Sequence, residues 1–369
     1  MKVLLANDEQ GFRGGEHQTI ALAVGLAARG CEVAIACRAG SPTAERAASE
    51  GIERIVLAFG KWPVATPIAL ARYISMLRPD ICHAQTAGAH THLWFARASV
   101  SSPPPLVVSR RVAFRIVPTP LALIKYRRGV AHFIPISQAA AESLARIGVP
   151  AGKMTIIPSG IETARFARRA EGAGRRRLGI RDDELVVGTV AAFEAEKGLS
   201  TLVDAAAALR SRGLRVRFVL AGEGRLGLRL AQQAARAGLG ESMIFAQRDL
   251  ALEETLGAFD IFALPSLEEG LSTALLAAMA SGLPVAASDT GGIPEAVCPE
   301  CAILVPPGDA GALAAALGRL LGDADLRRRM GEAGKARAAL FDISITVDRT
   351  LELYRAVLAN HETKSRRRR

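Results

Sequence analysis

The chain has 369 residues, half of them hydrophobic and few aromatic; this length is too great for one ordinary core and predicts two domains. A net charge of +11, from 47 Lys and Arg against 36 Asp and Glu, favours acidic partners such as phosphorylated ligands, anionic lipid or nucleic acid. Five cysteines, an odd number in a long chain, do not form a disulfide framework, and the single CxxC at 298–301 lacks the further ligands of a metal site.

The predicted strand 2–6 (KVLLA) opens the chain directly, with no charged segment and long apolar stretch before it. A secretory signal is therefore not expected. No run of about 18 uncharged apolar residues occurs, so no membrane span is expected either. We expect a cytoplasmic protein that touches at most the inner face of the cytoplasmic membrane.

Short β-branched runs alternate with alanine-rich stretches along the first half of the chain. The first series predicts strands at 2–6, 32–37, 54–57, 81–83, 106–109 and 132–136, and helices at 16–29, 42–50, 64–77 and after Pro120. Strand–helix repeats of this kind predict a parallel sheet.

Around 158–184 the pattern lapses into a Gly- and Arg-rich segment, which is the best candidate for a linker. A second series then predicts strands at 185–190, 215–221, 243–245, 260–265 and 285–287, and helices at 200–210, 226–237, 273–280 and 311–321. We therefore predict two doubly wound, Rossmann-like α/β domains that face each other across a cleft.

The C-terminal segment predicts a helix over 345–360, with Val347, Leu351, Tyr354 and Leu358 on one apolar face that must pack on another element. The predicted divisions are an N-terminal domain at 1–165, a C-terminal domain at 166–344, a helix at 345–362 that packs back toward the N-terminal domain, and a disordered basic tail at 363–369.

Four loops follow predicted strands, and the carboxyl ends of parallel strands are where open α/β sheets bind ligands. In the first, Gly14 and Gly15 precede a helix whose amino terminus favours an anion, although such a pair is also typical of an ordinary turn. In the second, Lys197 could meet a diphosphate as a point charge or simply be solvated. The third, LAGEG at 220–224, is typical of a tight turn in which Glu223 could contact a ligand.

The fourth loop, in PSLEEGLSTALLAAMASGLPV, places two carboxylates directly before a helix of small residues. The amides of Gly270, Leu271 and Ser272 would stand at the start of this helix, where they can bind an anion. Glu269, with Glu268 beside it, could accept hydrogen bonds from sugar hydroxyls. The stretch therefore predicts a binding site.

Together these loops resemble those of the family-4 (group 1) retaining glycosyltransferases, which have the two-Rossmann GT-B architecture. The resemblance covers nearly the whole chain. It rests on an ordered set of segments: GGE at 14–16, HFIPISQAAAESLARIGVPAGKMTIIPSGIETARF at 132–166, VGTVAAFEAEKG at 187–198, FVLAGEG at 218–224 and AFDIFALPSLEEGLSTALLAAMASGLPVAASDTGGIPEAV at 258–297. The segment from VVSRRVAF to KYRRG (107–129) also resembles a bacterial subset that acts on envelope polysaccharide or lipopolysaccharide acceptors.

The resemblance implies transfer of a sugar from a nucleotide-sugar donor to a cell-envelope glycan or glycolipid acceptor, with retention at the anomeric carbon and no enzymic nucleophile. It implies a donor in the C-terminal domain, with Lys197 on the diphosphate and Glu269 on the hexose hydroxyls, and an acceptor in the N-terminal domain. Gly15 would let the N-terminal loop approach the phosphates. No cofactor or metal is implied, because basic side chains and helix-start amides stabilise the leaving diphosphate.

The chain departs from the family pattern at two positions. Counting from Glu269, the second carboxylate of the Glu-x7-Glu motif, which accepts from the ribose, would stand at 277, where the chain has Ala277. The arginine that often precedes the lysine by five residues is replaced by Ala192. Each lost charged hydrogen bond could remove about 1.5–3 kcal/mol of donor binding. A sugar-nucleotide-binding homologue with weak or lost turnover is therefore the alternative.

On the acceptor side, Arg110 and Arg111 occupy the region where the family has a histidine, and His83 ends the strand 81–83. The arginines could bind an anionic acceptor or donor phosphates, or could be solvated, and His83 could line the acceptor site or be structural. The stretch KYRR (125–128) and the tail KSRRRR (364–369) predict peripheral contact with an anionic membrane, or else solubilising charge.

Two further classes of protein are alternatives to a glycosyltransferase. A nucleic-acid-binding protein is suggested only by the basic charge: no RNP-like, helix-turn-helix or zinc-finger pattern occurs, and the arginines are not interleaved with aromatics, so no nucleic-acid partner is expected. An epimerase of the same architecture would be expected to supply carboxylates and histidines as acid and base, and the motifs fit it less well.

Overall fold

A computed structural model describes residues 1–59, 65–167, 172–246 and 250–366 of the chain, and it divides the chain into two compact units. Unit 1 comprises Met1–Gly160 and Ile343–Arg369, and unit 2 comprises Ile161–Asp342. Unit 2 therefore begins five residues before the predicted start of the C-terminal domain at 166, and it ends two residues before the predicted end at 344.

Unit 1 is built on a parallel sheet in the order β3-β2-β1-β4-β5-β6, which is the strand order of a Rossmann fold. Its strands are β1 (Lys2–Asn7), β2 (Glu32–Arg38), β3 (Glu53–Leu57), β4 (Ile81–Ala84), β5 (Leu106–Arg110) and β6 (His132–Pro135). The central strand β1 lies between β2 and β4, so that Leu4 stands opposite both Ala34 and Cys82. β1 reads as an unbroken apolar run because it is buried on both of its faces.

Helices cover both faces of this sheet. They are α1 (Gly14–Ala27), α2 (Pro42–Ser49), α3 (Ala65–Leu77), α4 (Ala87–Ala98), α5 (Pro120–Arg127), α6 (Gln138–Ala145) and α16 (Ile343–Arg366), with a 3-10 turn, η1 (Ala151–Lys153). Alternate residues of β1 enter two separate cores: Leu4 packs with Leu70 and Leu93 of α3 and α4, whereas Leu5 packs with Leu26 and Tyr354 of α1 and α16.

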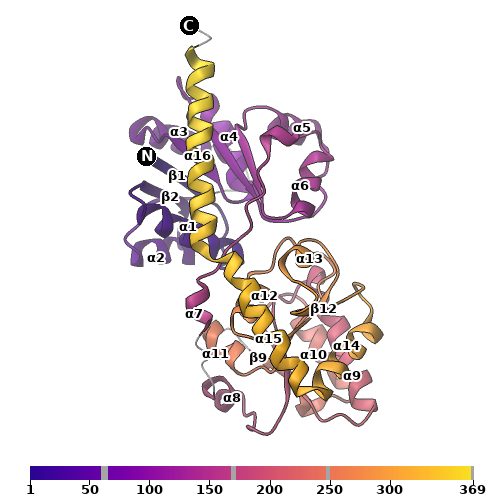
Figure 1. The fold of residues 1–369 in the computed structure, drawn as a ribbon. Helices are drawn as coiled ribbons and strands as arrows, with labels where there is room; N and C mark the ends of the chain where they lie inside the picture. Colours follow the sequence, from indigo (N-terminus) through magenta and orange to yellow (C-terminus); the bar gives the residue numbers. More distant parts are fainter. Residues whose placement is uncertain (60–64, 168–171, 247–249, 367–369) are drawn as a thin grey trace. The chain divides into compact units, whose positions relative to one another are not determined.

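The C-terminal helix α16 packs against α1 (Figure 1). A Cβ on Gly25 would lie 2.5 Å from Cγ2 of Val347, so only glycine allows this approach of the two helices. Arg29, just after α1, also pairs with Asp348. Because α16 continues to Arg366, residues 363–366, which the sequence predicts as part of a disordered tail, are helical, and 367–369 lie outside the described residues.

Unit 2 repeats the same strand order, as β12-β11-β10-β7-β8-β9. Its strands are β7 (Val186–Val190), β8 (Arg217–Ala221), β9 (Met243–Ala246), β10 (Ile261–Leu264), β11 (Val285–Ser288) and β12 (Ala302–Val305). Its helices are α7 (Thr163–Ala167), α8 (Ala173–Arg177), α9 (Leu199–Ser211), α10 (Gly227–Arg236), α11 (Leu252–Gly257), α12 (Thr273–Ala280), α13 (Ile293–Ala296), α14 (Ala310–Gly322) and α15 (Ala324–Ala338), with 3-10 turns η2 (Ala195–Lys197), η3 (Gly240–Ser242) and η4 (Ala339–Phe341). The predicted fold class, two Rossmann-like α/β domains, is confirmed.

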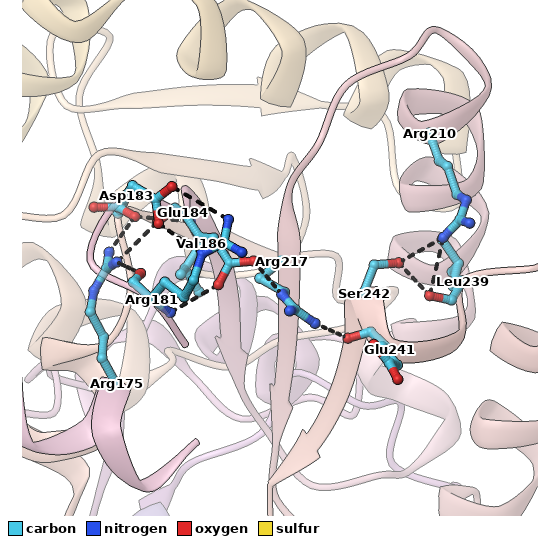
Figure 2. A network of polar contacts seen from close by, with 11 residues as sticks. Arg175, Arg181, Asp183, Glu184, Val186, Arg210, Arg217, Leu239, Glu241 and Ser242 are labelled. Carbon is cyan, nitrogen blue, oxygen red and sulfur yellow. Dashed lines mark hydrogen bonds and ion pairs between the residues drawn. The ribbon is translucent and has the colours of Figure 1, made fainter. Parts of the chain in front are cut away.

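The segment 158–184, which the sequence predicts as a linker, carries α7 and α8 and is tied to the sheet of unit 2 by arginines (Figure 2). Arg175 donates to Asp260 Oδ2 at 2.7 Å, and the same oxygen accepts from the amide of Val186 at the start of β7. Arg217 of β8 donates to Glu184 Oε1 at 2.8 Å. These contacts involve the residues just before β7 and β10, so part of the chain's basic charge stabilises unit 2 at the amino ends of its strands.

None of the helices in the described part of the chain is both long and apolar enough to cross a membrane. All five cysteines are free thiols, and Cys298 Sγ lies 3.3 Å from Cys301 Sγ within the CxxC loop.

Candidate active site

The candidate site lies in unit 2 where the strand order reverses. β7 and β10 are neighbours in the sheet, and the loops that follow them lead to α9 and α12. Loops that leave a parallel sheet at such a point diverge, and the crevice that they open is where doubly wound sheets bind ligands. Lys197 lies on the loop after β7, and Glu269 lies on the loop after β10.

These two predicted residues meet. Lys197 Nζ lies 2.7 Å from Glu269 Oε2, and Ser266 Oγ lies 3.3 Å from the same oxygen. The Glu269 side chain is 8% exposed and that of Lys197 is 23% exposed, so the carboxylate is held inside the site while the ammonium still reaches solvent. The interpretation of Lys197 as a merely solvated lysine is therefore wrong.

Backbone contacts fix the spacing of the two loops. The amides of Leu267 and Glu268 donate to Glu196 O at 2.8 and 3.2 Å. Gly198, at φ +58°, lies so close to the second loop that a Cβ would be 2.1 Å from Pro265 O. Only glycine fits there, because both the left-handed backbone and the approach exclude a side chain. Glu268 itself is exposed and joins the loops through its backbone.

The residues between Glu269 and α12 carry backbone amides that are not used in hydrogen bonds in the part of the chain that the structure describes. Ser272 caps the helix, and its Oγ accepts from the amide of Leu275 at 3.2 Å. Within the described residues, the amides of Gly270, Leu271 and Ser272 donate to no acceptor. Unpaired amides at the start of a helix bind anions. A diphosphate seated there would be met by these amides and by the ammonium of Lys197.

The loop after β11 packs against the backbone of Glu269, which was not predicted from the sequence. The amide of Gly292 donates to Glu269 O at 3.2 Å. A Cβ on Gly291, at φ +57°, would lie 1.8 Å from that carbonyl oxygen. The glycine pair in DTGG was the available signal, because a left-handed position in close contact with another backbone requires glycine.

The LAGEG loop after β8 is the tight turn that its glycines indicate. The carbonyl of Glu223 accepts from the amide of Phe193 at 2.8 Å. A Cβ on Gly222 would lie 1.9 Å from Ala191 O, so this loop packs on the loop after β7. The exposed residue Glu223 thus has a backbone role in the structure, and its contact with a ligand stays a prediction.

The two departures from the family pattern have different surroundings. Ala277 has no exposed surface and lies in α12, where all the residues from Leu275 to Ala280 are buried. Ala192 lies half-buried on the loop after β7. A carboxylate at 277 would therefore need extra space, and it would lose its hydration without gaining a partner that the sequence of α12 supplies.

In unit 1, the predicted glycine loop is part of a helix. α1 begins at Gly14, two residues earlier than predicted, and Glu16 closes the first turn by accepting from the amide of Arg13 at 2.8 Å. Gly15 lies next to Arg111, whose Cδ would be 3.7 Å from an added Cβ. The first turn of α1 therefore adjoins the arginine pair at the carboxyl end of β5.

Arg110 and Arg111 are not a solvated pair. Arg110 is 9% exposed and donates to Phe114 O at 2.6 Å; Arg111 donates to Gln85 and Ser159, and burial lowers its pKa to about 10. The Nε atoms of both guanidinium groups are buried without a hydrogen-bond partner. Neither arginine pairs with a carboxylate among the described residues. Glu16 attracts Arg111 without a direct ion pair, so both guanidinium groups keep donors that an anion could use.

His83 is a core residue. It is 1% exposed, its Nδ1 is hydrogen-bonded to Tyr354 Oη, and its Nε2 is 2.8 Å from Ser109 Oγ. Both ring nitrogens are therefore used inside the fold, which is the environment of a structural histidine. His83 therefore has no ring nitrogen available for an acceptor.

We expect acid to destabilise unit 1 through this histidine. Burial lowers the pKa of His83 to about 3, whereas in the unfolded chain the ring titrates near its ordinary value of 6.5. The stability of the neutral ring is therefore fully present above pH 6.5, and it is lost at about 1.4 kcal/mol per pH unit as the pH falls toward 3. Both tryptophans of the chain belong to unit 1, so their fluorescence during urea unfolding at several pH values measures the effect. His83→Gln should weaken the pH dependence, and an unchanged dependence would contradict the assignment.

Two family models match the chain in consecutive regions. Glycosyltransferase Family 4 matches residues 12–165, and Glycosyl transferases group 1 matches residues 172–337. The chain therefore carries the two domains of a GT-B glycosyltransferase. The first match lies in unit 1, apart from its last residues, and the second lies in unit 2 and includes Lys197 and Glu269.

The curated relatives match this chain over part of their length. The chain is 34% identical over 222 residues to the D-inositol 3-phosphate glycosyltransferase of Nocardia farcinica, which covers 57% of this chain and 49% of that protein. It is 34% identical over 203 residues to the amylovoran biosynthesis glycosyltransferase AmsK of Erwinia amylovora, which covers 52% of this chain and 48% of that protein. The chain thus spans about half the length of these curated relatives.

Solved structures agree over the whole fold. A glycosyltransferase from Rickettsia africae ESF-5 has a TM-score of 0.85 and 19% identity, and the match covers 97% of this chain and 99% of that chain. Alr3699/HepE of Anabaena, solved in complex with UDP-glucose, has a TM-score of 0.85 and 21% identity, with 96% and 100% covered. At this identity the likeness establishes the fold.

Proposed function

We propose that this GT-B glycosyltransferase moves a sugar from a nucleotide-sugar donor to a cell-envelope glycan or glycolipid acceptor, with retention of the anomeric configuration. The observation that carries the proposal is the contact of Lys197 with Glu269, 2.7 Å apart beside the open amides of Gly270–Ser272. A cation, unpaired amides and a carboxylate that could accept from sugar hydroxyls are thus gathered at one switch point.

In this proposal the site of unit 2 binds the donor and stabilises its leaving group. The bond between the anomeric carbon and the diphosphate oxygen breaks, and the acceptor oxygen forms a bond on the same face of that carbon. The acceptor proton passes to the leaving phosphate. Lys197 and the amides before α12 meet the charge that develops on the diphosphate, which is the role of preorganised donors in group transfer, so we assign no metal or other cofactor.

Glu269 has a different task in this proposal. Its carboxylate is held by Lys197 and Ser266 before the donor arrives, so it needs little reorganisation to accept from hexose hydroxyls. A buried carboxylate that pairs with sugar hydroxyls discriminates strongly against donors that lack them, because its lone pairs would be left unpaired.

The acceptor in this proposal carries an anionic group that unit 1 binds. Arg110, Arg111 and Lys125 lack carboxylate partners among the described residues, and burial lowers the pKa of each of the three side chains. An acceptor phosphate or carboxylate would supply the direct ion-pair partner that Glu16 and Asp8, which act only at a distance, do not. Relatives named for D-inositol 3-phosphate and for amylovoran biosynthesis suggest the first acceptors to try: a phosphorylated polyol and an envelope polysaccharide precursor.

We place the reaction in the cytoplasm, at the inner face of the membrane where a glycolipid acceptor would be presented. The five free thiols suit a reducing compartment.

A donor screen tests the proposal. Thermal unfolding is followed with a panel of nucleotide sugars, beginning with UDP-glucose, the ligand of Alr3699/HepE. A stabilising donor is then incubated with envelope extracts while release of nucleotide and the configuration of the product are measured. Stabilisation with release supports the proposal. Stabilisation without release from any pairing favours the alternative, a binding homologue without turnover, and no stabilisation by any donor overturns both.

A further inference from the structure

Exposed apolar side chains are concentrated between β5 and the end of α5. Of the twelve large hydrophobic residues that are exposed in the described part of the chain, four lie within eleven consecutive residues. We call them the α5 apolar patch: Phe114 at 37%, Val117 at 71%, Leu121 at 52% and Ile124 at 47% exposure. Apolar side chains that are scattered singly over a surface need no explanation, but a cluster of this kind marks an interaction surface.

The local structure presents these side chains outward. Thr119 caps α5 by accepting from the amide of Ala122, and Pro120 occupies the first turn. Leu121 and Ile124, three residues apart, therefore share one face of the helix. On the buried side, Tyr126 is 6% exposed and stacks on Phe133 of β6. The helix is thus anchored to unit 1 by one side and leaves Leu121 and Ile124 in solvent, while Phe114 and Val117 are exposed on the segment that leads into it.

Cations surround this surface without any acid in the same part of the sequence. Residues 81–141 contain seven Lys and Arg and no Asp or Glu. Arg115, Arg127 and Arg128 are exposed. Arg146, directly after α6, is exposed as well, and Glu142 is its carboxylate partner at 3.5 Å. The exposed charge beside the α5 apolar patch is therefore strongly positive.

A cavity adjoins the patch. It lies between the segment that connects β5 to α5 and the end of α6. The labels α5 and α6 lie next to each other in Figure 1. Its volume is about 430 Å³, and its walls are Arg115, Ile116, Pro118, Ser143, Arg146 and Ile147. Two arginines beside apolar side chains suit a ligand with an anionic head and an apolar body.

We propose that the α5 apolar patch docks on a bilayer that contains anionic lipid, with its apolar side chains at the acyl boundary and Arg115 and Arg146 on a lipid phosphate. A bilayer supplies both an apolar phase and a negative surface, and this surface needs both. A second copy of the chain on the same face would bring like charges together. Of the stretch KYRR that the sequence predicts, Arg127 and Arg128 are exposed beside this surface, whereas Lys125 is half-buried on Thr91 and Tyr126 is buried. The apolar side chains of the patch were not predicted.

This proposal rests on the membrane location given under the proposed function and names the surface that would bind the membrane. Its test measures vesicle binding and not sugar transfer, so the docking surface and the sugar transfer can be disproved separately. Full-length protein is sedimented with vesicles of phosphatidylcholine alone and with vesicles that also contain phosphatidylglycerol. We expect binding to the mixed vesicles, weakened by salt, and a loss of about tenfold or more in Val117→Ser/Leu121→Ser. Met76→Ser/Leu228→Ser is the matched control, because it removes side chains of 68% and 75% exposure elsewhere and should bind as the wild type does.

Two further variants separate insertion and headgroup binding from attraction by charge in general. Val117→Trp should show a blue-shifted emission on mixed vesicles only if this position enters the bilayer. Arg115→Gln/Arg146→Gln should weaken binding to mixed vesicles more than Arg212→Gln/Arg236→Gln does, since the latter pair lies in unit 2. Equal binding by the patch variant and the wild type would overturn the proposal. So would a change of oligomeric state, instead of vesicle binding, in the patch variant.

Discussion

Replacing Lys197 with alanine is expected to lower kcat/KM by about 10²–10³-fold, the usual effect of removing one preorganised donor from a developing anion. In the proposed reaction its ammonium meets the diphosphate as the bond to the sugar breaks. Lys335→Ala is the matched control, because Lys335 is the only other lysine in the sequence of unit 2 and pairs with Glu332 on the surface. The measurement is initial rate of nucleotide release with the donor that stabilises the protein.

Lys197→Ala also leaves Glu269 without its cation. The resulting loss of stability must be distinguished from the loss of catalysis. The carboxylate is 8% exposed, so Lys197→Ala should cost roughly 1–3 kcal/mol of stability. Lys197→Ala/Glu269→Gln removes the unpaired charge and should recover much of that stability without recovering turnover. If the double variant regains turnover together with stability, Lys197 is a structural residue and the assigned role is wrong.

Replacing Ala277 with glutamate, which would complete the Glu-x7-Glu spacing, is expected to destabilise the ligand-free protein by roughly 3–5 kcal/mol. Ala277 has no exposed surface, and its neighbours in α12 are buried as well. A carboxyl group there loses its hydration, so the folded state favours the protonated form. The destabilisation should therefore grow as the pH rises above about 4.3, the ordinary pKa of a glutamate.

Thermal unfolding of Ala277→Glu and Ala277→Leu between pH 5 and pH 8 measures this effect, with the pH values chosen to span roughly the range in which a buried carboxyl titrates. The leucine variant adds bulk without charge, so its loss of stability should not depend on pH. A glutamate variant as stable as the wild type across this range would show that the position opens into the donor site. In that case the missing carboxylate is a matter of donor affinity and not of packing.

Much of the fold could be predicted because its strands are short apolar runs at regular intervals. Several of the elements that were not predicted lack this signal. β12 is a four-residue run directly after the CxxC loop, and α15 is largely polar, with only Met330, Gly331, Gly334 and Ala338 buried. α7 and α8 fall in the Gly- and Arg-rich segment, where their contacts with the rest of unit 2, rather than local propensity, hold them.

The meeting of Lys197 and Glu269 could be predicted because both follow strands that are adjacent in a Rossmann sheet. The supports of the site could not. Gly198 and Gly291 are needed only because backbone from another loop lies against them, and this is a property of the folded chain. His83 reaches Tyr354 across 271 residues of sequence, so neither residue alone indicated a structural role.

The most direct test is a crystal structure of the protein with the nucleotide sugar that stabilises it. The account predicts diphosphate oxygens within hydrogen-bond distance of Lys197 Nζ and of the amides of Gly270–Ser272, with hexose hydroxyls on Glu269. A diphosphate bound instead at Arg110 and Arg111, or anywhere away from Lys197, would contradict it.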